Sequence, residues 1–124
     1  MKKLLSFAIF ASMLVACGSD TPKADDTPDV VVKKCLKLVI EEDKQAVKCF
    51  NFKSEDEKNI LLEKMSYKAK GIKEMGSVKS IKTNLDYELG SSAGVRYKVT
   101  FNNGESFSKM AELTKINNTW YMER

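Results

Sequence analysis

The sequence predicts an α+β fold in which about three N-terminal helices pack on one face of a four-stranded antiparallel sheet. Apolar residues recur at helical spacing up to Ala69, and after Gly76 they alternate with polar residues at the period of a strand. Asn103-Gly104 and Asn117-Asn118 are turn signals that divide the second half of the chain into strands. Helices followed by a meander of strands are typical of the α+β class.

The first two predicted helices flank an acidic turn at residues 41–43. The first opens at Pro28, and its lysines lie opposite an apolar stripe made by Val31, Val32, Cys35, Leu36, Val39 and Ile40. The second is short, with apolar residues at Ala46, Val47, Cys49 and Phe50. These spacings predict two amphipathic helices that face the same core.

The third predicted helix begins at a capping box formed by Ser54 and Glu57. The acids at residues 55–57 also suit the positive end of the helix dipole. We expect this helix to end at Gly71, because glycine readily takes the left-handed conformation that terminates helices.

Four strands are expected after Gly76. Alternation in the first two indicates that each buries one face, with apolar positions at Ile81, Leu85, Tyr87, Leu89, Val95, Tyr97, Val99 and Phe101. A third strand is expected at about 105–116 and a fourth at about 120–123.

The N-terminus has the three parts of an export signal: Lys2 and Lys3, then an apolar run from Leu4 to Ala16, then Cys17. The run of 13 residues would make a helix of about 20 Å, which is too short for a bilayer core of about 30 Å. Leu14-Val15-Ala16-Cys17 resembles the lipobox of bacterial lipoproteins. The resemblance implies a diacylglycerol on the Cys17 sulfur, which anchors the chain to a membrane.

We therefore expect a signal peptide at residues 1–16, a lipidated cysteine and flexible tether at 17–28, and a single α+β domain at 29–124. This organisation places the domain in the cell envelope. Gly18 stands where some bacteria read an aspartate as a signal for the inner membrane, which favours the outer membrane and leaves the leaflet open. Removal of Lys2 and Lys3 leaves 19 basic residues against 17 acidic ones, and only two of the basic residues are arginines, so nothing indicates a nucleic-acid partner.

Two further cysteines, Cys35 and Cys49, lie in the first two predicted helices. Each is seven residues from Glu42, so antiparallel helices would bring the two to a similar height. An exported protein can keep a disulfide, but free cysteines are also common in apolar cores. The sequence leaves both readings open.

The mature chain resembles the cystatin-like and nuclear-transport-factor-two-like superfamily, and more closely a group of small bacterial lipoproteins that carry such a domain of unknown function. The residues behind the resemblance are Pro28, Val31, Val32, Asp43, Ala93, Val95, Tyr97, Val99, Asn103, Gly104, Leu113, Lys115 and Trp120. The resemblance implies a curved four-stranded antiparallel sheet whose concave face holds the helices.

The chemistry of the chain argues against an enzyme. There is no histidine, which removes the commonest general base and the commonest zinc ligand, and no phosphate-binding glycine loop is present. We therefore predict no catalytic residues, no metal and no cofactor. Some enzymes of the resembled superfamily use an acid and a tyrosine in the pocket, and the candidates here would be Asp86 and Tyr87, or Tyr97. Asp86 and Tyr87 are adjacent in a strand, however, and should face opposite sides.

Two sets of residues remain as candidate sites. A pocket or core between helices and sheet would contain Phe50, Tyr87, Tyr97, Phe101 and Trp120, and a partner-binding sheet face would contain Lys82, Asp86, Arg96 and Lys98. The leading hypothesis is a membrane-anchored lipoprotein that presents a small non-catalytic binding or scaffolding domain to an envelope protein. The alternatives are a small-molecule carrier or enzyme that uses the pocket, and a structural lipoprotein that forms a homodimer.

Overall fold

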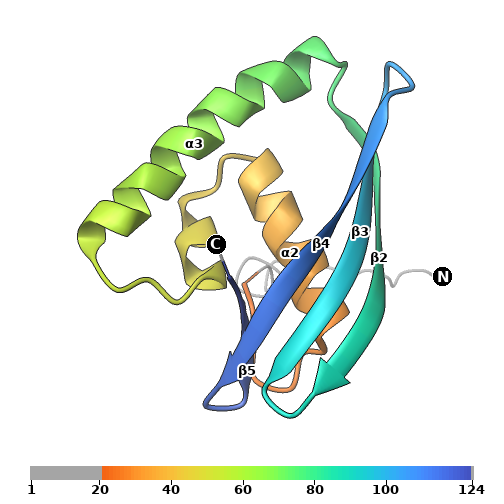
Figure 1. Ribbon diagram of the computed structural model, residues 1–124. Helices are drawn as coiled ribbons and strands as arrows, with labels where there is room; N and C mark the ends of the chain where they lie inside the picture. Colours follow the sequence, from red (N-terminus) through yellow and green to blue (C-terminus); the bar gives the residue numbers. More distant parts are fainter. Residues whose placement is uncertain (1–20, 124) are drawn as a thin grey trace, which may run out of the picture.

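The computed structural model describes residues 21–123 (Figure 1). The predicted signal peptide at 1–16, Cys17 and the first residues of the predicted tether lie outside the described residues. Within the described part, no helix has the length and apolar character needed to cross a membrane.

Three helices form the first half of the described chain: α2 (Pro28–Ile40), η1 (Lys44–Cys49) and α3 (Glu55–Glu74). Pro28 occupies the first turn of α2, where its missing N–H costs no hydrogen bond. The acidic turn separates α2 from η1, and the Asp43 carboxylate accepts a hydrogen bond from the Gln45 amide at 2.9 Å. The predicted second helix is a 3-10 helix of 6 residues.

The capping box of α3 is confirmed, except that the Glu57 side chain bonds to the amide of Lys53 and not to that of Ser54. The Ser54 hydroxyl accepts from the Glu57 amide at 3.3 Å, and the Glu57 carboxylate accepts from the Lys53 amide at 2.9 Å. The predicted stop at Gly71 is wrong, because α3 continues to Glu74. The left-handed residue that follows the helix is Gly76, whose φ is +86°.

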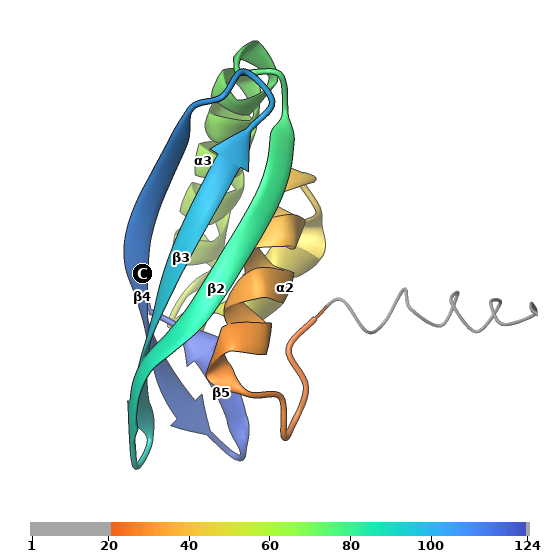
Figure 2. The same cartoon turned by 90° about the vertical axis from the view of Figure 1, so that its right-hand side faces the viewer.

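Four antiparallel strands make the sheet: β2 (Val78–Leu89), β3 (Ser92–Phe101), β4 (Ser106–Ile116) and β5 (Thr119–Met122). Their order in the sheet follows the chain, β2-β3-β4-β5, as expected for a meander. Figure 2 shows the strands twisting across the face, with the helices on the far side. Asn117 and Asn118 both have positive φ, at 50° and 66°, which is the conformation of a tight hairpin turn. The predicted α+β fold is confirmed.

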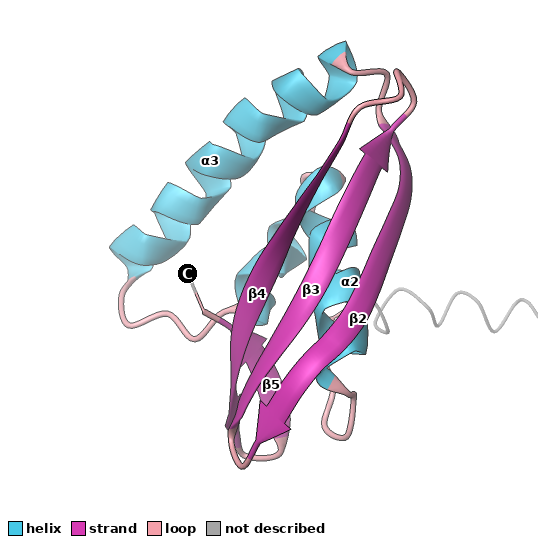
Figure 3. Cartoon of the chain, turned by 45° about the vertical axis from the view of Figure 1, so that its right-hand side comes forward, coloured by secondary structure: helices cyan, strands magenta, loops and turns pink. Residues whose placement is uncertain are grey.

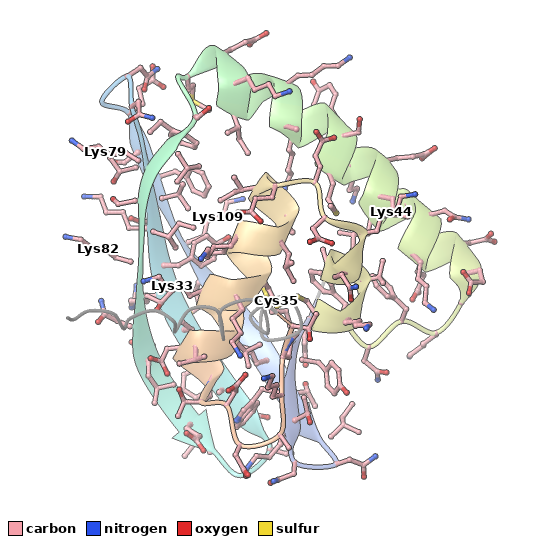
Figure 4. All side chains as sticks on the ribbon, turned by 180° about the vertical axis from the view of Figure 1, so that it is seen from behind. Lys33, Cys35, Lys44, Lys79, Lys82 and Lys109 are labelled. Carbon is pink, nitrogen blue, oxygen red and sulfur yellow. A yellow bond between two sulfur atoms is a disulfide. The ribbon has the colours of Figure 1, made fainter. Side chains whose placement is uncertain are left out.

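The core lies between one face of α2 and the inner face of the sheet. Five residues of α2 are buried, and the sheet opposes them with buried Ala93, Val95, Ala111, Leu113 and Trp120. Cys35 and Cys49 form a disulfide with a Cα–Cα distance of 5.9 Å, which joins α2 to η1 (Figure 4). Among the described residues, the buried side chains of this core lie between Pro28 and Trp120, so a segment of residues 21–124 includes every one of them.

The described part of the predicted tether lies against the domain. The Asp26 carboxylate pairs with the Lys34 ammonium at 2.7 Å, and the Asn118 amide donates to the Asp25 carboxylate at 2.8 Å. Burial alone would raise the pKa of Asp26, but Lys34 and the Lys23 amide hold it below its ordinary value. These two contacts attach residues 25 and 26 to α2 and to the turn that follows β4.

The two glycines at the end of α3 should respond oppositely to alanine. Gly71 is inside the helix and a Cβ there would meet nothing within 4 Å, so Gly71→Ala should raise the free energy of unfolding by about 0.5–1 kcal/mol. Gly76 has positive φ and a Cβ would lie 3.2 Å from the Asn102 Cβ, so Gly76→Ala should lower it by about 1–2 kcal/mol. Urea unfolding of both variants measures this, and a loss of stability in Gly71→Ala would contradict the assignment of Gly71 to the helix interior.

Candidate ligand-binding cleft

A cleft of about 580 Å³ lies between α3 and the upper part of the inner sheet face. Figures 1 and 3 show α3 standing apart from the strands, and α3 packs mainly on α2 and η1. The volume falls within the range of small-molecule sites, about 300–1,000 Å³. The cleft is therefore large enough to hold a ligand.

The floor of the cleft comes from alternate residues of two neighbouring strands. Tyr97, Val99 and Phe101 of β3 face the helices, and β4 adds Phe107 and Lys109 beside them. The Phe107 ring lies 5.9 Å from the Phe101 ring and edge-on to the Tyr97 ring at 6.3 Å. Since successive strand residues point to opposite faces, this spacing of two places three aromatic rings together.

The walls of the cleft come from α2 and α3. Leu36, Val39 and Ile40 of α2 form one wall, beside the stripe that α2 buries in the core. The opposite wall contains Ile72 and Gly71 of α3, where the glycine leaves open space in place of a side chain. The surface of the cleft is predominantly apolar.

One end of the cleft is closed by a set of hydrogen bonds between the β3–β4 hairpin and the end of α3. The Asn102 side-chain amide donates to the Gly76 carbonyl at 2.6 Å, and its backbone amide donates to the Ser77 carbonyl at 3.0 Å. The Asn103 amide donates to the Met75 carbonyl at 3.1 Å. These bonds hold α3 at a fixed distance from the hairpin.

The charged groups around the cleft are mainly basic: Lys68, Lys70 and Lys109, against Glu74 alone. Among residues 21–123, the ion pairs involve none of these three lysines. Burial raises the pKa of Tyr97 above its ordinary value, and its hydroxyl is protonated at neutral pH in either case. The cleft thus offers cations and a hydroxyl donor to a ligand.

Among the residues that line the cleft, Glu74 on the α3 wall is the only acid. Both cysteines of the described chain are held in the disulfide, and no described group of acids, cysteines or histidines could hold a metal ion.

The predicted pocket residues separate into three places. Tyr97 and Phe101 line the cleft, and Trp120 is buried in the core beneath α2. Phe50 packs against the edge of the same core and forms an isolated β-bridge with Met122 of β5. Its ring lies 5.5 Å from the Phe52 ring. Only Tyr97 and Phe101 of the predicted set therefore line the cleft.

The prediction that Tyr87 faces the helices is wrong, because β2 contains a register shift between Leu85 and Tyr87. The extra residue turns Tyr87 to the outer face, where its ring covers Gly94 and its hydroxyl donates to the Glu112 carboxylate at 3.3 Å. Partial desolvation and the nearby Glu112 raise the pKa of Tyr87. Asp86 lies on the same outer face, so the prediction that these neighbours point to opposite sides is also wrong.

The predicted partner face is the outer face of the sheet. Arg96 pairs with Asp86 at 3.1 Å across β2 and β3, and Lys82 stands directly opposite Lys98 in the register. Figure 4 shows Lys79 and Lys82 projecting from β2 away from the helices. The four predicted residues share one exposed surface, and the part of it around Lys82 and Lys98 is basic.

Sequence reasoning missed four residues that shape the cleft: Lys68, Gly71, Asn102 and Lys109. A signal existed for Gly71, since the helical spacing of apolar residues continues to Ile72 beyond it. Lys68 and Lys109 are far apart in the chain, and no local pattern indicates that they lie around one cleft.

Comparison with known proteins finds a structural neighbour. No family model and no curated protein matches the sequence. A crystal structure of a Campylobacter jejuni protein provisionally named an NTF2-like transpeptidase matches 80% of this chain and 99% of its own, with a TM-score of 0.69 and 26% sequence identity. The described chain therefore has an NTF2-like fold, the fold that the resemblance implied.

The contact between Tyr87 and Gly94 can be tested with a double-mutant cycle. Because the Tyr87 ring occupies the place of a Cβ on residue 94, Gly94→Ala should lower the free energy of unfolding by about 1–3 kcal/mol. In a Tyr87→Ala background the same change should be neutral or stabilising, since the ring is gone. Equal costs in both backgrounds, measured by urea unfolding, would show that the two residues are not in contact.

Proposed function

We propose that the chain is a lipid-anchored protein of the bacterial cell envelope whose NTF2-like domain binds an apolar ligand in the cleft without transforming it. The observation that carries this proposal is the cleft itself, which is open, apolar and lacking in paired catalytic groups. NTF2-like domains serve both as enzymes and as binding domains, and the residues around this cleft favour the second role. The ligand is held for transport, sensing or presentation near the membrane.

The anchor in this proposal rests on the N-terminal sequence. Lys2, Lys3, the apolar run and Cys17 together match a lipoprotein signal, and Gly18 favours the outer membrane. Two or more acyl chains hold a protein stably at a membrane, whereas one binds only reversibly. The short stretch between Cys17 and the docked Asp25 would keep the domain close to the lipid surface.

Binding in the cleft should be blocked by filling it. The neutral dye Nile red should bind the segment of residues 21–124 saturably with one site, and Gly71→Phe should abolish the binding because the ring extends into the open space at Gly71. Gly71→Ala is the matched control and should keep the site. Fluorescence titration measures the affinity, and either no saturable binding or unchanged binding by Gly71→Phe would overturn the cleft as the site.

Anchoring should depend on Cys17. Cells grown with a labelled palmitate analogue should incorporate the label into the full chain and carry the protein in the membrane fraction. Cys17→Ala should lose both the label and the membrane association, while Cys35→Ala should keep the label. Labelling of the Cys17→Ala variant would contradict the lipoprotein assignment.

The outer sheet face is the weaker candidate for an interaction surface. Lys82 and Lys98 stand opposite each other without an acidic partner among the described ion pairs, so two copies packed through this face would bring like charges together. The exposed Arg96–Asp86 pair adds little, because such surface pairs contribute only about 0–1 kcal/mol. This charge pattern disfavours a homodimer formed through the sheet face.

A further inference from the structure

We infer that the cleft takes a single-chain amphiphile with an anionic head, its apolar chain directed to the closed end and its head held by Lys68, Lys109 and Tyr97. This inference deepens the proposed function and rests on it, since it assigns a ligand class to the same cleft. It follows from how polarity changes along the cleft, from which end is closed, and from charges that lack partners.

The polarity of the cleft is graded along the strands. Tyr97 and Lys109 are directly opposite each other in the β3–β4 register, and two residues further along, Val99 and Phe107 are opposite each other. Phe101 follows at the end of β3. The floor therefore changes from a hydroxyl and an ammonium to purely apolar side chains over about 13 Å, the length of four strand residues.

The α3 wall has the same gradient. It begins with Tyr67 and Lys68, and one turn later it presents Ile72, followed by Glu74 and by Met75, the residue that caps the helix. Glu74 lies four residues after Lys70, at the spacing that lets opposite charges on a helix compensate each other. Lys68 on the wall and Lys109 on the floor have no acid of the cleft lining at such a spacing.

The apolar end is also the closed end. Met75 and Phe101 adjoin the residues that carry the hydrogen bonds between Asn102, Asn103 and the end of α3. An anionic head at that end would exchange its water for apolar side chains and would lie near the Glu74 carboxylate, and both effects are unfavourable. A ligand with one apolar chain and one polar head is consequently bound in one orientation.

The polar end selects the sign of the head. Lys68 and Lys109 come from opposite sides of the cleft, and neither forms an ion pair within the described residues. Tyr97, directly opposite Lys109 in the register, adds a hydroxyl that can donate a hydrogen bond at neutral pH. Two ammonium groups and a hydroxyl donor match the oxygens of a carboxylate or a phosphate, to which charged hydrogen bonds are strong.

The test uses displacement of Nile red from the segment of residues 21–124 by three ligands with the same chain: dodecanoate, dodecyl phosphate and dodecanol. The double variant Lys68→Gln/Lys109→Gln is compared with Lys73→Gln, which removes a lysine of α3 that does not line the cleft. We expect the anionic ligands to displace the dye at about tenfold lower concentration than dodecanol. The double variant should lose this preference, while Lys73→Gln should keep it.

The outcomes separate the two proposals. If Nile red binds but dodecanol displaces it as well as the anions do, or if the double variant keeps the preference, the anionic ligand class is wrong and the cleft remains a binding site. If Nile red does not bind at all, the proposed function fails as well. A preference for dodecanoate over dodecyl phosphate, or the reverse, identifies the head group within the inferred class.

Discussion

The lengths of the elements impose the constraint on which the rest of the structure depends. α2 has 13 residues and spans about 20 Å, whereas β3 has 10 residues and spans about 33 Å. One helix of this length covers the sheet around Ala93 and Val95, and beyond Tyr97 the buried Val99 and Phe101 border the cleft. α3 crosses above the remainder without packing into it, so the cleft results from a short helix on a long sheet.

The register shift between Leu85 and Tyr87 in β2 separates residues that face the helices from residues of the polar outer face. Before it, Ile81 and Leu85 have the inward register, and after it Tyr87 lies on the outer face with Asp86, Arg96 and Glu112. The shift removes a large aromatic ring from the inner face and adds it to a polar surface. Without it, the register that pairs Leu85 with Val95 would pair Tyr87 with Ala93, and the Tyr87 side chain would face the helices.

Local signals predicted the fold well, because each depends on residues that are close in sequence. The stripe of α2, the cap at Ser54 and the turn at Asn117 and Asn118 are of this kind. Tyr87 was misplaced because the alternation of apolar and polar residues in the sequence does not reveal a register shift. The pairing with β3 determines where such a shift occurs. The cleft could not be predicted, because Lys68 and Lys109 lie around it only as a result of how far α3 stands from the sheet. No pattern of neighbouring residues in the sequence indicates that distance.

The support of α3 has a mechanical consequence. Buried Met65 and Ala69 hold α3 on the core, and the Asn102 side chain donates a hydrogen bond to the Gly76 carbonyl just after the helix. The last turn of α3, at residues 70–74, is therefore fixed on both sides. It would adjust to ligands of different width by slight bending of the helix and not by the movement of a loop. Such bending is gradual, so the cleft would widen by degrees and would not switch between an open and a closed state.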